Sequence, residues 1–286
     1  MSNNAKGLAL TSLGVLIMSL ESLFVKLTNI DALTFCFYLG IFIFISMTSF
    51  LIIKQKDVIS KITKTSFPML IICATLMGSS NVFFISGLKN TSVANVVLIF
   101  GTAALFSSLF AFLIYKERIT KNIILASIFM IIGLVVIFVD ELSLGGMKGN
   151  IFALLSVCTF SLAFVFLVRY KNISRVVLTA CLGISMSIIS LIFSDTLNID
   201  LRTLGIIAIM GLFITPVARV LMGNGTKYIN ASEVTLLMII ETVMAPVWVW
   251  LFLNEIPSSN TFIGGFIIVF TLIINSLYTL RKGNIK

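Results

Sequence analysis

Two glutamates and one arginine lie inside long apolar stretches of this chain of 286 residues. Glu21 lies in the second half of the first stretch, Arg219 toward the end of the eighth, and Glu241 near the middle of the ninth. A charge at the centre of a bilayer costs at least about 2.5–3.5 kcal/mol, which makes such residues candidate functional groups. A carboxylate there can bind a cationic group or carry a proton, and a guanidinium can bind a carboxylate or a phosphate. The alternatives are a structural pair between Glu241 and Arg219, a structural partner for Glu21, and extension of the Arg219 side chain to the membrane interface.

Three further side chains accompany these charges. Trp248 follows Glu241 by seven residues, so both fall near one face of a helix, where an indole could stack on a planar ligand or anchor at the interface. Asn81 and Asn224 lie in the third and eighth stretches, where an amide either lines a cavity or bonds a neighbouring helix. The candidate binding or coupling residues are therefore Glu21, Asn81, Arg219, Asn224, Glu241 and Trp248.

The sequence lacks the residues that several kinds of chemistry require. The chain has no histidine, and its four cysteines lie in apolar runs without a CxxC spacing. We therefore expect no metal centre and no disulfide. No GxxxxGK[ST] motif is present to hold a nucleotide phosphate, and no nucleophile stands beside a base. The sequence thus predicts that the protein is not an enzyme and uses no cofactor.

The composition places these residues in a membrane protein. Hydrophobic residues make up 59% of the chain and charged residues 11%, with a mean hydropathy of +1.14. A bilayer-spanning helix needs about 20 mostly apolar residues. Ten such runs cover residues 7–25, 33–53, 67–86, 93–115, 122–139, 150–168, 176–193, 203–223, 232–253 and 261–280. We predict an all-α membrane protein of ten transmembrane helices joined by short loops.

Lysine and arginine are distributed unevenly between alternate loops. With the N-terminus placed in the cytoplasm, fifteen of the 20 basic residues fall on the cytoplasmic side and four on the outer side, and Arg219 stays within a helix. The cytoplasmic set is Lys6, Lys54, Lys56, Lys61, Lys64, Lys116, Arg118, Lys121, Arg169, Lys171, Arg175, Lys227, Arg281, Lys282 and Lys286, and the outer set is Lys26, Lys89, Lys148 and Arg202. Positive residues accumulate on the cytoplasmic side of membrane proteins. The distribution predicts two cytoplasmic ends and an even number of spans.

The chain also resembles itself at an offset of 138 residues. The matches join Val82, Gly87, Lys89, Val96, Leu98, Leu113 and Glu117 to Val220, Gly225, Lys227, Val234, Leu236, Leu251 and Glu255. The two glutamates lie just beyond helix ends, where we expect them to interact with backbone N–H groups. Five helices in each half give the second half the opposite orientation. The sequence therefore predicts two inverted repeats, residues 1–140 and 147–286, an architecture of secondary transporters.

The ends of both halves resemble a known family. Ala231–Glu241, the pair Ala245 and Pro246, and Leu253–Glu255 are similar to the end of an EamA domain, and Tyr115–Thr120 ends the first half in the same way. Two such units in tandem resemble the drug/metabolite transporter (DMT) superfamily, whose members carry amino acids, metabolites, nucleotides or drugs, often outward. The chain departs from the family pattern at Thr242, at Asn254 and at Leu20–Glu21.

These observations lead to one expected function with two alternatives. We expect a secondary transporter in the cytoplasmic (inner) membrane that moves a small organic metabolite by alternating access, as an exporter, with protons as a candidate coupling ion. The alternatives are an uncoupled facilitator or channel, and a membrane scaffold that transports nothing. The expected partners are the small-molecule substrate and the lipid bilayer. No nucleic acid partner is expected, because the net charge of +9 resides in membrane-flanking loops.

Overall fold

All regular secondary structure in the described part of the chain is helical. The computed structural model describes residues 3–54, 67–117, 121–144, 146–170, 173–225, 228–229 and 231–283, without the side chains of residues 3–4, 54, 140–144, 223, 231–236, 276 and 279–283. Of the basic residues that predict the orientation, Lys56, Lys61, Lys64, Arg118, Lys171, Lys227 and Lys286 lie outside the described residues.

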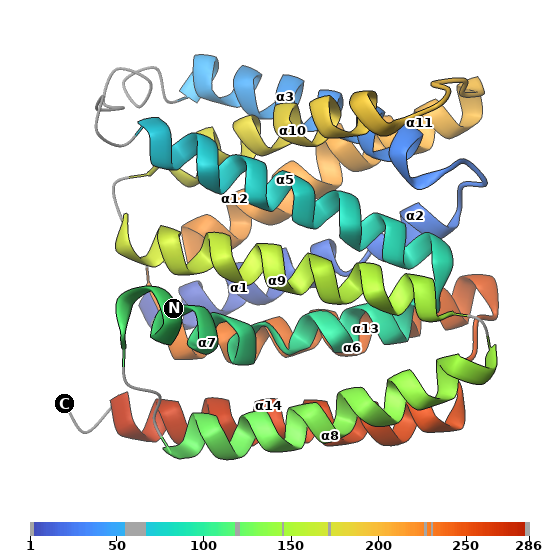
Figure 1. Cartoon of the computed structure of the whole chain (residues 1–286). Helices are drawn as coiled ribbons and strands as arrows, with labels where there is room; N and C mark the ends of the chain where they lie inside the picture. Colours follow the sequence, from blue (N-terminus) through green and yellow to red (C-terminus); the bar gives the residue numbers. More distant parts are fainter. Residues whose placement is uncertain are drawn as a thin grey trace.

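The helices follow one another with short connections (Figure 1). They are α1 (Asn3–Met18), α2 (Glu21–Lys26), α3 (Ala32–Lys54), α5 (Phe67–Asn90), α6 (Val93–Gly101), α7 (Ala103–Tyr115), α8 (Lys121–Leu144), α9 (Met147–Arg169), α10 (Arg175–Phe193), α11 (Leu201–Ile209), the π-helix η1 (Met210–Ile214), α12 (Thr215–Gly225), α13 (Ala231–Leu253) and α14 (Ser259–Gly283). In Figure 1, α1 begins and α14 ends on the left side of the bundle.

Eight segments of the described chain are long and apolar enough to cross a bilayer. They are Ala5–Lys26, Ala32–Ile53, Phe67–Asn90, Val93–Tyr115, Lys121–Val139, Met147–Arg169, Arg175–Phe193 and Leu201–Met222. Two shorter apolar stretches, Leu237–Leu253 and Ser259–Asn275, lie within α13 and α14. The chain is therefore a multi-pass membrane protein, and the predicted spans 232–253 and 261–280 stay predictions.

Three stretches that the sequence predicts as single helices are interrupted. The first breaks between α1 and α2, the fourth at Thr102 between α6 and α7, and the eighth at η1. In η1 the hydrogen bonds skip to the fifth residue rather than the fourth, a geometry that is rare and frequent at functional sites. Hydropathy alone does not reveal such breaks, because it averages over the whole span.

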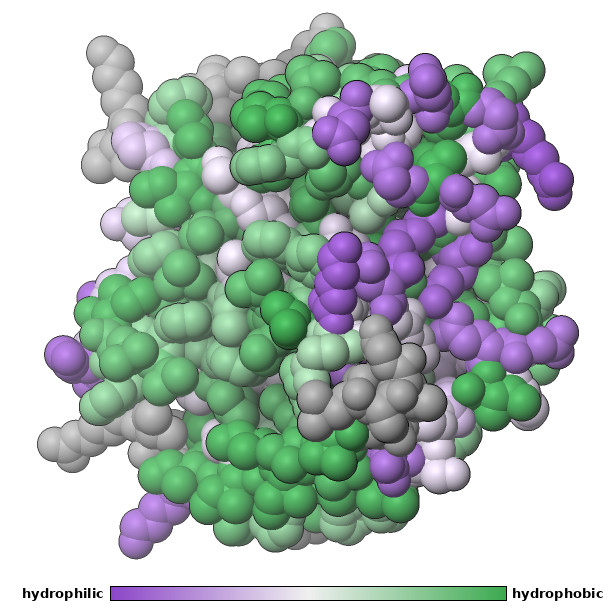
Figure 2. Space-filling model, turned by 45° about the vertical axis from the view of Figure 1, so that its right-hand side comes forward, coloured by the Kyte–Doolittle hydropathy of each residue, from purple (hydrophilic) through white to green (hydrophobic). Residues whose placement is uncertain are grey.

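The surface between the two ends of the bundle is apolar. Large side chains such as Phe129, Ile132, Phe266 and Phe270 are exposed on α8 and α14. Figure 2 shows apolar residues over most of the visible surface and hydrophilic residues gathered on its right-hand side. An exposed apolar belt of this extent is the natural contact surface for lipid acyl chains.

Helix pairs from distant parts of the chain pack closely at glycines. The pairs are α1 with α12, α3 with α10, α5 with α9, and α8 with α14. A Cβ on Gly183 of α10 would lie 2.6 Å from the carbonyl oxygen of Gly40 on α3, and one on Gly264 would lie 2.7 Å from that of Gly133. Small residues allow this approach, which supplies much of the packing energy between helices in lipid.

The α3–α10 crossing gives the first prediction. Gly183→Ala should lower the melting temperature of the purified protein in detergent, because overpacking at this contact costs about 1–3 kcal/mol. Gly205→Ala is the matched control, since nothing lies within 4 Å of the added Cβ and alanine is the better helix former. Equal melting temperatures of the two variants, measured by intrinsic fluorescence, would contradict this account of the crossing.

Candidate functional site

Three irregular helices meet around Glu21. The chain leaves α1 at Met18, turns through Ser19 and Leu20, and starts α2 at Glu21. Both η1 and α13 pack against α2. Pro216 follows η1, and Pro246 lies inside α13, where a missing N–H leaves the helix one hydrogen bond short. Broken backbone at membrane depth is tolerated where it is buried in protein or lines a cavity, so this junction is a candidate site.

The carboxylate of Glu21 has a partner on the eighth span. Thr215 Oγ1 donates a hydrogen bond to Glu21 Oε1 over 2.6 Å. Thr215 is buried and directly follows η1, so the π-helix places this hydroxyl where it faces α2. The contact joins helices that are far apart in the sequence and gives Glu21 the compensation that a carboxylate in a membrane requires.

Arg219 and Glu241 complete a charged group with Glu21. The guanidinium of Arg219 attracts both carboxylates, and Glu21 and Glu241 repel one another. Among the described residues, no ion pair within 4.0 Å joins Arg219 to either glutamate. Its buried Nε atom has no hydrogen-bond partner in the described part of the chain. Among these residues, the three side chains therefore interact at a distance and not through direct contacts.

Asn81 lies against the same place from α5. It lines a small cavity of about 10 Å³ together with Glu21 and Thr215, and its Nδ2 donates to the carbonyl oxygen of Met77 over 2.8 Å. Leu88, which is fully buried, also lines this cavity. A volume of this size holds about one water molecule, so the conformation described here encloses the site.

A much larger groove of about 1350 Å³ lies at the opposite end of the bundle from the start of α1. Its walls come from the α2–α3 connection, α5, α9 and the end of α10, and include Lys89, Lys148 and Asp195. Leu88 lines this groove as well as the small cavity, so it borders both spaces.

Trp248 and Asn224 occupy different environments. Trp248 Nε1–H donates to Ser19 Oγ over 2.9 Å, which ties α13 to the break between α1 and α2. Asn224 lies exposed in the last turn of α12 and is not among the residues that line the small cavity. Of the six predicted residues, the structure therefore gathers Glu21, Asn81, Arg219, Glu241 and Trp248 around the helix breaks and places Asn224 elsewhere.

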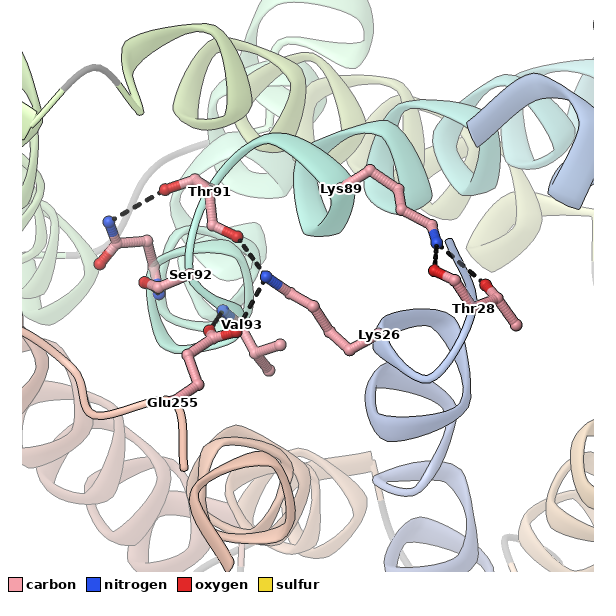
Figure 3. A network of polar contacts seen from close by, with 8 residues as sticks. Lys26, Thr28, Lys89, Thr91, Ser92, Val93 and Glu255 are labelled. Carbon is pink, nitrogen blue, oxygen red and sulfur yellow. Dashed lines mark hydrogen bonds and ion pairs between the residues drawn. The ribbon is translucent and has the colours of Figure 1, made fainter. Parts of the chain in front are cut away.

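A polar network closes the end of the bundle that carries the groove (Figure 3). Lys26 Nζ lies 2.9 Å from Glu255 Oε2 and donates to the carbonyl oxygen of Thr91 over 2.9 Å. The N–H of Val93, at the start of α6, donates to Glu255 Oε1 over 2.7 Å. The prediction that Glu255 interacts with a backbone N–H is confirmed. Beside it, Lys89 donates to the hydroxyl oxygen of Thr28 over 2.9 Å.

Some residues of the candidate site cannot be predicted from the sequence. Thr215 and Ser19 are ordinary hydroxyl residues in apolar stretches, and only the neighbouring Pro216 hints at a break near the first. Its position in the sequence indicates only that Lys26 lies in an outer loop, and its pairing with Glu255 depends on the fold. Contacts of this kind join opposite halves of the chain, and a single sequence carries no signal for them.

Comparisons with known proteins give one family match and several relatives. The model of the EamA-like transporter family matches residues 5–139 and again residues 147–277. An uncharacterized transporter of Clostridium kluyveri is 25% identical over 82% of this chain and 79% of its own length. The uncharacterized transporter YdfC of Bacillus subtilis is 27% identical over 64% of this chain, which spans 62% of that protein. A crystal structure with 15% identity has a TM-score of 0.66 over 96% of this chain and 98% of its own, which speaks for the fold alone.

The Thr215–Glu21 contact gives the second prediction. Thr215→Val keeps the shape of the side chain and removes the donor, and a hydrogen bond to a charged group is worth about 1.5–3 kcal/mol. The melting temperature should fall, and the fall should shrink in a Glu21→Gln background, because the two residues act as a pair. Thr159→Val is the control, since the hydroxyl of Thr159 donates to the carbonyl oxygens of Leu155 and Ser156 in its own helix. Additive effects of Thr215→Val and Glu21→Gln would show that the two side chains are not coupled.

Proposed function

The chain belongs to the EamA-like transporter family, and from that premise we propose that it is a secondary transporter of a small organic metabolite. The transport takes place by alternating access around the helix breaks at Glu21 and η1 and around Pro246 inside α13. The proposed cargo is an amino acid, a nucleotide-like compound or a drug, and the proposed direction is outward, as for many members of the superfamily that the chain resembles. No enzymatic step is proposed.

The proposed architecture is ten spans in two inverted halves, residues 1–140 and 147–286. The double match of the family model supports it. Two helix pairs support it as well. The pair of α5 and α9 corresponds to the pair of α12 and α1 when the two halves are interchanged. Gly87 packs against Gly149 in the first pair, and Gly225 packs against Gly7 in the second.

The ends of α7 and α13 support the same architecture. Lys116 and Asn254 are the described non-glycine residues with a positive φ, at 58° and 55°, and they lie 138 positions apart. Each ends its helix in the left-handed conformation that usually calls for glycine, and each precedes one of the matching residues Glu117 and Glu255. The departure from the family pattern at Asn254 thus keeps the backbone geometry with a residue that tolerates it.

The proposed orientation puts the start of α1 and the end of α14 in the cytoplasm. The uneven distribution of basic residues supports it. The network of Lys26 and Glu255 then lies at the outer face of the cytoplasmic membrane. A chain oriented in this way carries the large groove on the outside, and Leu88 borders both this groove and the Glu21 cavity.

The observation that carries the proposal is the group of ionisable side chains gathered at the helix breaks. Glu21 and Glu241 interact there with the single guanidinium of Arg219, so acidic groups exceed basic groups by one. An amine of the substrate or a coupling proton on Glu21 or Glu241 would remove the excess, and Arg219 could meet an acidic group of the substrate. Trp248 and Asn81 supply a planar surface and an amide beside these charges. Intramembrane ionisable groups of this kind mark substrate and proton pathways.

A ligand screen by thermal shift tests the proposal. Amino acids, purine compounds, vitamins and cationic drugs are added to the purified protein in detergent, and a compound at 100 times its Kd should add about 2.7 kcal/mol of stability. We expect the shift to disappear in Glu21→Gln or Glu241→Gln. It should persist in Asp195→Asn, which neutralises an exposed carboxylate away from the central charges. A stabilising compound whose effect is the same in all three variants would place its binding site elsewhere.

A further inference from the structure

The two ends of the bundle carry equivalent ion pairs from opposite halves. Lys26 is the last residue of α2, at the end of the first span, and pairs with Glu255, which follows α13. Arg169 is the last residue of α9 and approaches Glu117, which follows α7. When the halves are interchanged, Glu117 corresponds to Glu255, 138 positions away. Lys26 corresponds to Arg169, because each ends the first span of its half.

The two pairs are in different states. Lys26 Nζ and Glu255 Oε2 are 2.9 Å apart, and their side chains are only 20% and 26% exposed. Arg169 and Glu117 are 4.0 Å apart at their closest nitrogen and oxygen, and their side chains are 61% and 60% exposed. The Arg169 guanidinium instead lies over the ring of Tyr115, 4.7 Å from its centre. One pair is therefore closed and partly shielded from water, and its counterpart is loose and solvated.

The closed pair links the elements that would have to separate at the outer end. Glu255 connects the α13–α14 connection to Lys26 of α2 and, through the Val93 N–H, to the start of α6. Lys26 adds the carbonyl oxygen of Thr91 at the end of α5. One ion pair thus fastens parts of both halves to one another, as the dashed lines in Figure 3 show.

We propose that Lys26–Glu255 and Arg169–Glu117 are the outer and inner latches of one conformational cycle, each closed when the other is open. This inference rests on the proposed alternating access and adds the residues that hold each state. The conformation described here is the one in which the outer latch is closed. The opposite conformation forms when Arg169 and Glu117 take up the contacts that Lys26 and Glu255 make now.

The Lys26–Glu255 pair differs from an ordinary surface ion pair in its geometry. An exposed ion pair adds little to stability. One carboxylate oxygen of Glu255 pairs with the Lys26 ammonium, and the other accepts from a backbone N–H at the start of a helix. Such charge-assisted hydrogen bonds are stronger than those between neutral groups. Replacement by glutamine keeps an acceptor for the Val93 N–H and removes the attraction for Lys26, so it weakens the latch without removing the helix cap.

A thiol-labelling experiment tests the latches without a known substrate. Ile85→Cys places a reporter on the lining of the small central cavity, and a membrane-impermeant maleimide is applied either to intact cells or to inverted membrane vesicles. The chain with only its four natural cysteines gives the background. We expect Glu255→Gln to raise the rate of reporter labelling from outside at least threefold. Glu117→Gln should leave that rate unchanged or lower it.

A matched control and a rescue exclude simpler explanations. Lys148→Gln removes a positive charge from the same end, where Lys148 lies over the Phe152 ring, and should not change labelling. The exchange Lys26→Glu with Glu255→Lys should return the rate toward that of the unmodified latch. Labelling from outside that is the same in Glu255→Gln, Glu117→Gln and the parent would overturn the latches. If a compound still stabilised the protein through Glu21 or Glu241, the transporter proposal would stand without them.

Discussion

A charge inside a membrane needs compensation from its neighbours, and this requirement shapes the centre of the protein. Glu21 obtains one hydrogen bond from Thr215, and Arg219 and Glu241 act on it from a distance. A regular α-helix in the eighth span would point Thr215 in another direction. The π-helix is therefore part of the arrangement that brings its hydroxyl to Glu21. The breaks between α1 and α2 and at η1, together with Pro246 inside α13, make room for polar groups that a continuous helix would direct into lipid or into its own backbone.

The need to compensate charge is met differently at the centre and at the end of the bundle that carries the groove. At the centre, no ion pair within 4.0 Å joins Arg219 to either glutamate among the described residues, and in the proposed function a ligand or a proton completes the charge balance. At the end that carries the groove, Lys26 and Glu255 satisfy one another and several backbone groups. Fully paired groups stabilise one arrangement, whereas incompletely paired groups respond to what binds. In the proposed function, the ends hold conformations and the centre recognises the cargo.

The sequence predicts the membrane architecture well because apolar length is a strong and local signal. Eight of the predicted spans have their counterparts in the structure, and the family resemblance is confirmed. The breaks at Ser19 and at η1 are not predicted, because they depend on packing against neighbouring helices. Glu21 and Asn81 stand out as polar residues in apolar stretches, and the structure places them on one cavity. Asn224 carries the same signal and lies exposed, since polarity does not say which way a helix face turns.

Counterflow in proteoliposomes tests the central claim most directly. Vesicles containing the protein are loaded with an unlabelled compound that stabilises it, and uptake of the labelled compound is followed over time. A site that opens to one side at a time predicts a transient accumulation of label above its equilibrium level, and loss of that accumulation in Glu241→Gln. Uptake that rises only to equilibrium, whatever the vesicles contain, would identify a channel and contradict alternating access.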